Sequence, residues 1–298
     1  MSKNIDFADL KKLFLDRVPL IDVRAPIEFE LGHLPGAINL PILTNFEREQ
    51  VGIMYKKQGQ DAAIKLGQEL VSGDIRTERI TAWKKYIEKQ QNAVIYCFRG
   101  GLRSRTTQNW LKEINIQRPL MIGGYKRARR FLISLTEELS QKNNLLVISG
   151  RTGSGKTKLL HEAQKFHPVI DLEALANHRG SAFGHMKTAQ PSQSNFENNL
   201  ATELLQLDNH NVQTKKILLE DESRMIGKIT QPEIFFSKLR ESEIIWLEES
   251  IESRVENIMS EYLNDLTETD VLFQNFENAI KAISRKLGGA NTAEILKD

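Results

Sequence analysis

The chain has 298 residues, of which 40% are apolar and 27% charged, and its net charge at pH 7 is +2. This composition excludes a disordered or fibrous chain, and the length favours two domains over one. No apolar run reaches the roughly 18 residues that span a bilayer, the amino terminus lacks a signal-peptide core, and the single cysteine excludes internal disulfides and cysteine-rich zinc sites. We therefore expect a cytoplasmic protein, and the sequence assigns no metal-ligating set.

Short apolar strands alternate with helices along the first half of the chain. The expected elements are a helix capped by Asp6, buried strands over residues 19–23 and 92–96, helices over 45–90 and 104–114, and a strand over 119–122. Strands that alternate with helices indicate a parallel sheet. The sequence therefore predicts an α/β domain over residues 1–140.

A second α/β unit follows the polar stretch at residues 140–144. It begins with a strand over 145–149, and further strands are expected at 168–172, 216–219 and 243–247, with helical stretches between them. This pattern again favours a parallel sheet. The predicted second domain covers residues 141–298.

The loop around the lone cysteine is rich in glycine and arginine. Cys97 ends a buried strand, and the residues of the following loop that could bind an anion are Arg99, Gly100, Gly101, Arg103 and Ser104. Backbone N–H groups at the start of a helix bind anions, and such surroundings favour the thiolate form of a cysteine. We therefore predict that Cys97 is a nucleophile. The alternative, a buried core residue, is disfavoured because glycine and arginine crowd the position.

Residues 150–157 match the phosphate-loop pattern G-x-x-x-x-G-K-[ST] at every fixed position. An apolar strand precedes this segment and a helix follows it, as the pattern requires. The predicted phosphate-binding residues are Gly150, Gly153, Gly155, Lys156 and Thr157. Backbone N–H groups and Lys156 are expected to hold phosphates, and Thr157 can hold Mg²⁺.

Several other charged residues are candidate site residues, and for each of them an ordinary structural role is the alternative. One of Glu220, Asp221 and Glu222 should be the acidic partner of the phosphate loop, and surface solvation is the alternative for the other two. His178 and Arg179 could contact a phosphate group, or lie in an ordinary loop. Arg254 could touch a phosphate or lie on an exposed helix. The basic run Lys126, Arg127, Arg129 and Arg130 is either a polyanion-binding patch or a solvated helix face.

The first half resembles a rhodanese domain, in which the cysteine carries sulfur or selenium as a persulfide or perselenide. The resemblance rests on residues 22–24 with Glu28, residues 32–41, the cysteine loop and residues 123–125. Five residues separate Cys97 from Arg103, one more than in common sulfurtransferase loops and as many as in cysteine phosphatases. A wider loop implies a bulkier anion, such as phosphate or selenophosphate.

The whole chain resembles the bacterial tRNA 2-selenouridine synthase family, in which a rhodanese domain precedes a P-loop domain. Beyond the two loops, the matching segments are residues 51–52, 55–56 and 59, residues 171–173, 178–181 and 183–184, and residues 190–193, 196–197, 222–224 and 226–227. Family members are also expected to continue past residues 287–289 for several tens of residues, including another strand, whereas this sequence ends at Asp298.

The resemblance implies a transferase that replaces the sulfur of wobble 2-thiouridine in tRNA by selenium from selenophosphate. It implies a geranyl group taken from geranyl diphosphate and an S-geranyl intermediate. The implied partners are tRNA and the two small phosphorylated substrates, with no membrane, and contact with the selenophosphate-producing enzyme is compatible with the scheme. Whether the phosphate loop holds geranyl diphosphate, a nucleotide or tRNA phosphate stays open.

Two other functions compete with this hypothesis. A sulfurtransferase or phosphatase-type rhodanese enzyme coupled to a P-loop kinase would share both loops but would not account for residues 171–197. A tRNA-binding protein without activity would tolerate the loss of Cys97 or Lys156, yet both are present.

Overall fold

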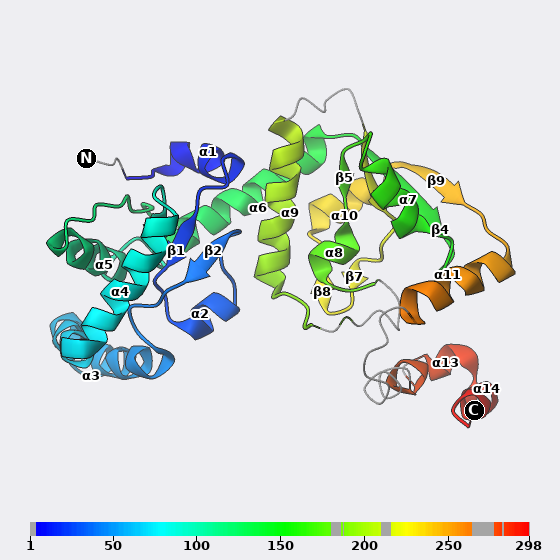
Figure 1. Cartoon of the computed structure of the whole chain (residues 1–298). Helices are drawn as coiled ribbons and strands as arrows, with labels where there is room; N and C mark the ends of the chain where they lie inside the picture. Colours follow the sequence, from blue (N-terminus) through cyan, green and yellow to red (C-terminus); the bar gives the residue numbers. More distant parts are fainter. Residues whose placement is uncertain are drawn as a thin grey trace. The chain divides into compact units, whose positions relative to one another are not determined.

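The computed structural model describes residues 4–179, 186, 188–209, 216–263, 277–281 and 283–297, without the side chains of residues 261–263 and 286. The chain divides into two compact units (Figure 1). Unit 1 comprises residues 1–135 and 197–202, and unit 2 comprises residues 136–196 and 203–298. Each unit is described by itself.

The sheet of unit 1 is parallel and has the strand order β2-β1-β3. Strand β1 is Leu20–Asp22, β2 is Ala37–Asn39 and β3 is Val94–Tyr96. The strand expected over residues 119–122 is absent from the described structure as a continuous strand. Only isolated bridges form there, between Leu120 and Ile95 and between Met121 and Ile5, because the chain turns at once into Gly123 and Gly124.

Helices surround this sheet (Figure 1), and the side chains of β1 and β3 are buried. They are the 3₁₀ helix η1 Phe7–Asp9, α1 Leu10–Leu15, α2 Pro26–Glu30, α3 Asn45–Leu70, α4 Gly73–Lys89, α5 Leu102–Glu113 and α6 Gly124–Lys142. Asp6 accepts a hydrogen bond from the Phe7 amide and so caps the first of them. Trp83 is fully buried and donates from Nε1 to the Leu40 carbonyl at 2.9 Å, which fixes α4 to the core.

The main sheet of unit 2 is parallel, with the order β5-β6-β4-β9. Its strands are β4 Leu145–Gly150, β5 Val169–Ile170, β6 Ile217–Glu220 and β9 Glu243–Leu247, and a small antiparallel pair joins β7 Met225–Ile226 to β8 Ile229–Thr230. The helices are α7 Lys156–Ala163, α8 Leu172–Ala176, α9 Gln193–Asn209, α10 Glu233–Arg240, α11 Ile251–Leu263, α13 Ser284–Leu287 and α14 Gly289–Ile295. Parallel strands place their carboxyl ends at one edge, where open α/β sheets bind ligands.

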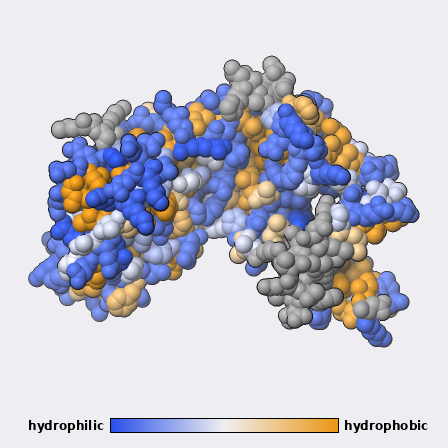
Figure 2. Space-filling model, viewed as in Figure 1, coloured by the Kyte–Doolittle hydropathy of each residue, from blue (hydrophilic) through white to orange (hydrophobic). Residues whose placement is uncertain are grey.

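The visible surface in Figure 2 is largely hydrophilic, with apolar residues scattered among the polar ones. Such a mixture is ordinary for a folded domain. Among the described helices, none combines the length and apolar character needed to cross a membrane.

Candidate functional site

The cysteine loop of unit 1 lies against the turn that begins helix α6. The Cys97 carbonyl accepts a hydrogen bond from the Tyr125 amide, and the Phe98 carbonyl accepts one from Lys126, both at 2.9 Å. Gly124 has φ +55°, and a Cβ there would lie 2.2 Å from the Cys97 carbonyl oxygen. Only glycine permits this approach, so the double glycine of the sequence fixes the backbone beneath Cys97.

The thiol of Cys97 is free and 3% exposed. Its Sγ lies 3.3 Å from Oγ of Ser104, and that hydroxyl lies 3.1 Å from the Gly101 carbonyl, to which it donates. Ser104 has a single hydroxyl proton. It can therefore accept from the thiol while bonded to Gly101, or rotate and donate to a thiolate. Of the predicted loop residues, Ser104 therefore lies directly beside the sulfur, and Gly101 holds its hydroxyl in place.

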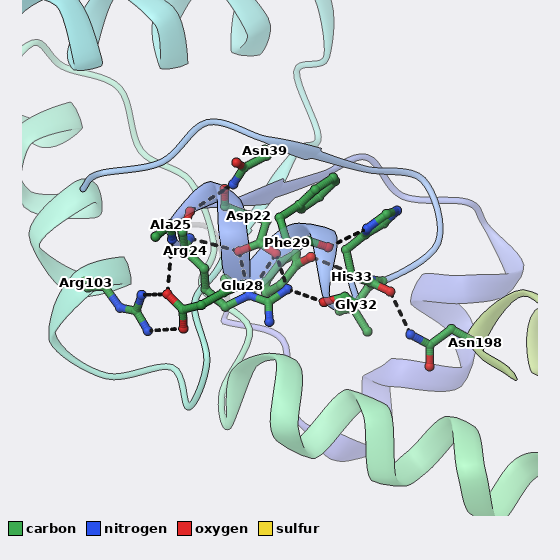
Figure 3. Close-up of polar contacts among 12 residues, drawn as sticks. Asp22, Arg24, Ala25, Glu28, Phe29, Gly32, His33, Asn39, Arg103 and Asn198 are labelled. Carbon is green, nitrogen blue, oxygen red and sulfur yellow. Dashed lines mark hydrogen bonds and ion pairs between the residues drawn. The ribbon is translucent and has the colours of Figure 1, made fainter. Parts of the chain in front are cut away.

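The two loop arginines have different surroundings. Arg99 is exposed, and its guanidinium carbon lies 5.8 Å from the Phe98 ring centroid. Arg103 instead forms a two-point ion pair with Glu28, NH1 to Oε2 at 2.5 Å and NH2 to Oε1 at 3.1 Å (Figure 3). Gly100 has φ +65° and is packed against residues 121–124. Arg103 therefore braces the loop through Glu28, while Arg99 is accessible to an anion.

Glu28 collects further donors from two other segments. It accepts from the Ala25 amide at 3.2 Å and lies 3.2 Å from Nε of Arg48. Burial alone would raise the pKa of Glu28, but the hydrogen bonds and charge of Arg103, with help from Arg48, hold it below its ordinary value. Glu28 is therefore a carboxylate, and its charge is balanced.

A second ion pair lies beneath the loop and is fully buried. Arg24 donates to both carboxylate oxygens of Asp22 and, at 2.7 Å, to the Gly32 carbonyl (Figure 3). Its guanidinium carbon lies 4.1 Å from the Tyr125 ring centroid. Removing one partner of such a pair leaves an unpaired buried charge, which is strongly destabilising. The pair therefore connects strand β1 to the turn that supports Cys97.

Two of the four arginine and lysine residues in the predicted basic patch have partners in the fold. Arg127 pairs with Asp6 at 2.9 Å. Arg129 pairs with Glu197 and donates at 3.0 Å to Asn198 Oδ1. The other two, the half-buried Lys126 and the exposed Arg130, form no ion pair with any described residue. The surface open to a polyanion is smaller than the sequence alone indicates.

The phosphate loop of unit 2 connects β4 to α7. Gly153 and Gly155 have φ of +81° and +80°. Nζ of Lys156 donates to the Gly150 carbonyl at 3.0 Å, so the lysine folds back over the loop. The Thr157 hydroxyl, in the first turn of α7, lies 3.5 Å from Glu173 Oε2. All five predicted phosphate-binding residues therefore lie in one strand–loop–helix segment.

Helix α11 also holds this loop, a role that the sequence did not indicate. Nε of Arg254 donates to the Thr152 carbonyl, and Nδ2 of Asn257 donates to the Gly153 carbonyl, each at 2.9 Å. Arg254 was expected either to touch a phosphate or to lie on an exposed helix. In the structure it instead binds the backbone of the loop.

Three carboxylates converge beside Lys156 and Thr157. One ligand atom from each of Glu173, Glu220 and Glu222 lies within 4.8 Å of the others, an arrangement that could hold a metal ion. Glu220 is 0% exposed, and neither of its carboxylate oxygens accepts a hydrogen bond in the described part of the chain. The sequence offered only Thr157 as a possible Mg²⁺ ligand and missed Glu173. The feature of the sequence that could have indicated Glu173 is its position just after strand β5, because the carboxyl ends of parallel strands form the edge where such sheets bind ligands.

Burial raises the pKa values of all three carboxylates. Burial, followed by the negative charges of Glu220 and Glu222, raises the pKa of Glu173 to about 9. Burial and the charge of Glu220 raise the pKa of Glu222 to about 7. Burial and the charge of Asp171 also raise the pKa of Glu220, against the opposing effects of the nearby Thr157 hydroxyl and the Lys156 charge. The cluster therefore resists carrying its full negative charge without a cation.

The remaining predicted residues lie around this cluster. Asp221 points elsewhere: it accepts from Ser149 Oγ at 2.6 Å and from Arg240 NH1 at 2.8 Å. This leaves Glu220 and Glu222 as the acids beside the phosphate loop. His178 is buried, and its amide donates to the Glu173 carbonyl at 3.0 Å; Arg179 follows it and is half-buried. Residues 180–181 and 183–184 of the predicted segment lie outside the described residues.

Comparison with protein families assigns each unit. Residues 6–131 match the rhodanese-like domain, and residues 143–298 match the family described as tRNA 2-selenouridine synthase AAA domain. The fold class expected from the sequence, a rhodanese-like α/β domain followed by a P-loop α/β domain, is confirmed.

Curated relatives match along nearly the whole chain. A tRNA 2-selenouridine synthase of Nitrosomonas europaea is 48% identical over 99% of this chain and 83% of its own length. One of Bdellovibrio bacteriovorus has the same identity and coverage, and one of Shewanella denitrificans is 45% identical over 98% of this chain and 81% of its own length.

Proposed function

Because this chain belongs to the tRNA 2-selenouridine synthase family, we propose that it is a cytoplasmic transferase that replaces the sulfur of wobble 2-thiouridine in tRNA by selenium. The observation that carries this proposal is the pairing, in one chain of this family, of a cysteine loop with a separate phosphate loop. Residues 1–140 are assigned to the selenium chemistry and residues 141–298 to the diphosphate chemistry.

The proposed reaction has two balanced steps. In the first, the 2-thiouridine sulfur attacks C1 of geranyl diphosphate, the carbon–oxygen bond breaks, diphosphate leaves, and the N3 proton of the base is released to solvent. In the second, the Cys97 thiolate attacks C2 and geranylthiol leaves with a proton; the selenium of selenophosphate then attacks C2 and displaces the cysteine, and water cleaves the selenium–phosphorus bond to give 2-selenouridine and phosphate. Each step needs an anion-binding site, one for a diphosphate and one for selenophosphate, and the chain has two loops suited to anions.

Cys97 is assigned to the selenium step. Its sulfur lies beside the Ser104 hydroxyl, which can donate to a thiolate, at the start of a helix whose free N–H groups favour negative charge. Arg99 is the exposed cation that can receive the phosphoryl oxygens of selenophosphate, while Arg103 and Glu28 keep the loop in shape.

The phosphate loop is assigned to geranyl diphosphate. A leaving diphosphate gains charge as its bond to carbon breaks, so a positive group aimed at it acts mostly in the transition state. Lys156 is that group, and it must leave the Gly150 carbonyl to reach the ligand.

The acidic cluster fits a divalent cation such as Mg²⁺. The fit rests on Glu220, which is buried with both carboxylate oxygens unpartnered, and on the carboxylate oxygens that this ion prefers as ligands. Glu173, Glu220 and Glu222 would hold it, with the Thr157 hydroxyl alongside. When bound, the cation would neutralise charge on a diphosphate.

Mass analysis of tRNA nucleosides tests the proposal. Thiolated tRNA is incubated with the protein and geranyl diphosphate, and selenophosphate is then added. We expect S-geranyl-2-thiouridine after the first addition and 2-selenouridine after the second. Persistence of 2-thiouridine through both additions would contradict the proposed function, and selenation that requires ATP in place of geranyl diphosphate would assign the phosphate loop to a nucleotide.

A further inference from the structure

Helix α3 is a bent arm in unit 1. At Gly59 the backbone leaves the helix, with φ 85° and ψ −171°, a region open in practice only to glycine. A Cβ placed on Gly67 would meet Cγ2 of Val51 at 3.6 Å, so the segments before and after Gly59 lie side by side. We call residues 45–70 the α3 hairpin.

The α3 hairpin is almost uncovered. The structure describes every one of its residues, and only Glu47 and Ala63 are buried. Residues 55–61 are all exposed, and Tyr55 exposes 57% of its surface. Isolated short helices are marginal in water, and most helical stability comes from packing an apolar face. Because so few of its residues are buried, the α3 hairpin offers an exposed surface to which a partner can bind.

Tyr55 stands between two glycines on its own helix face. Gly52 and Gly59 occupy the positions three before and four after it, which are its neighbours on the helix surface. A Cβ added to either glycine would meet no atom within 4 Å. Packing within the described chain therefore does not require Gly52, although glycine weakens a helix interior. The bare backbone keeps the tyrosine ring open to close approach.

The charge beside this ring is positive. Lys56 and Lys57 are the only charged residues from position 50 to 60. Both are exposed, and neither forms an ion pair in the described part of the chain. Lysines beside an exposed aromatic ring suit nucleic acid, since phosphates pair with the lysines and an unpaired base stacks on the ring.

The base of the hairpin is joined to the cysteine loop. Arg48, in its first turn, lies 3.2 Å from the Glu28 carboxylate, which in turn grips Arg103. Asn45 accepts from the Ile27 amide at 2.9 Å. The arm therefore rises from the same network that braces the loop of Cys97.

We propose that the α3 hairpin is an RNA-docking arm: Lys56 and Lys57 bind tRNA phosphates, and Tyr55 stacks on a base that is not paired. This rests on tRNA being the substrate and names the surface that receives it. A protein partner would be served better by an apolar patch with few lysines. Phe46 and Ile53 of the hairpin are also exposed, but the fully exposed run of residues 55–60 combines one aromatic ring with two lysines, which favours RNA.

Equilibrium binding of thiolated tRNA to the whole chain tests the arm. Tyr55→Ala should weaken binding at least about tenfold, whereas Tyr55→Phe, which keeps the ring, should bind like the unmodified protein. Lys56→Gln/Lys57→Gln should lower the slope of log affinity against log salt by about 2. The matched control is Lys84→Gln/Lys85→Gln, the same charge change on exposed residues of helix α4, which should leave the slope unchanged.

Gly52→Ala separates docking from folding. Alanine favours the helix and meets no atom, so the melting temperature should stay equal or rise, while tRNA affinity falls. The proposal is overturned if Tyr55→Ala and the double lysine variant keep the affinity and slope of the unmodified protein. It is equally overturned if they bind tRNA normally but lose binding to purified selenophosphate-producing enzyme. Selenation by the unmodified protein is measured in parallel, so that failure of the arm is distinguished from failure of the proposed function.

Discussion

The charged side chains that brace the cysteine loop form ion pairs, whereas the three carboxylates beside the phosphate loop face one another. Glu28 is surrounded by donors, and its pKa lies below the ordinary value. Glu173, Glu220 and Glu222 face one another, and their pKa values lie above it. The charges that brace the first site are balanced within the protein itself. The second reaches charge balance only with a cation or with proton uptake, so the two loops should respond differently to mutation, pH and metal.

The largest expected effect is that of Cys97→Ala. Selenium incorporation should be abolished, because the variant lacks the proposed nucleophile, while geranylation should survive, because the tRNA sulfur itself attacks geranyl diphosphate. Nucleoside mass analysis measures both products, and circular dichroism checks folding. Full selenation by the folded variant would remove the assignment of Cys97.

Lys156→Ala should reduce geranyl transfer by at least about 10²-fold, the scale for removing one preorganised electrostatic group. The rate of S-geranyl product formation in a single turnover measures this. Lys158→Ala is the matched control, since Lys158 is the exposed lysine two residues further along helix α7. Equal rates for the two variants would mean that the phosphate loop does not act on the diphosphate.

The acidic cluster should make stability depend on pH in a defined direction. The pKa values of Glu173 (about 9) and Glu222 (about 7) in the folded protein exceed the unfolded value of 4.5, so the folded state binds protons more tightly. The free energy of unfolding contributed by the cluster is therefore greatest below pH 4.5 and falls as the pH rises toward 9. Thermal melting in a chelator from pH 5 to 9 should show this decline, and Mg²⁺ should reverse it at the alkaline end.

The variant Glu220→Gln tests whether the acidic cluster causes both the pH dependence and the response to Mg²⁺. Removing the unpartnered buried charge should flatten the pH dependence and abolish the response to Mg²⁺, while the exposed Glu249→Gln should change neither. A cation response that persists in Glu220→Gln would place the ion elsewhere.

The smallest effect is expected from helix α6. Lys126→Gln/Arg130→Gln should reduce the salt slope of tRNA binding by up to about 2 without loss of stability, because neither residue has an ion-pair partner in the described structure. Arg129→Gln should instead lower the melting temperature, because it breaks the contacts with Glu197 and Asn198. If Lys126→Gln/Arg130→Gln leaves the slope unchanged, those two residues are only solvated.

The sequence predicted the features that are local in the chain. Each of the two loops is recognisable in the sequence because a strand, glycines and a following helix occur within a few residues. Strand β9 lies at residues 243–247 as expected. Features that depend on tertiary contact were missed. Arg103 and Glu28 are 75 positions apart, and nothing near either residue indicates the pair. Asp221 is adjacent to Glu220 and Glu222 in the sequence, which suggested a shared role. In the structure it binds Ser149 and Arg240 instead.

The central claim is that the two loops serve separate steps, and tRNA that already carries S-geranyl-2-thiouridine tests it most directly. With this substrate and selenophosphate, the single-turnover rate of 2-selenouridine formation is measured for the unmodified protein, Cys97→Ala and Lys156→Ala. We predict that Lys156→Ala matches the unmodified protein and that Cys97→Ala forms no product. Loss of selenation in Lys156→Ala, or its retention in Cys97→Ala, would contradict the division of labour between the two loops.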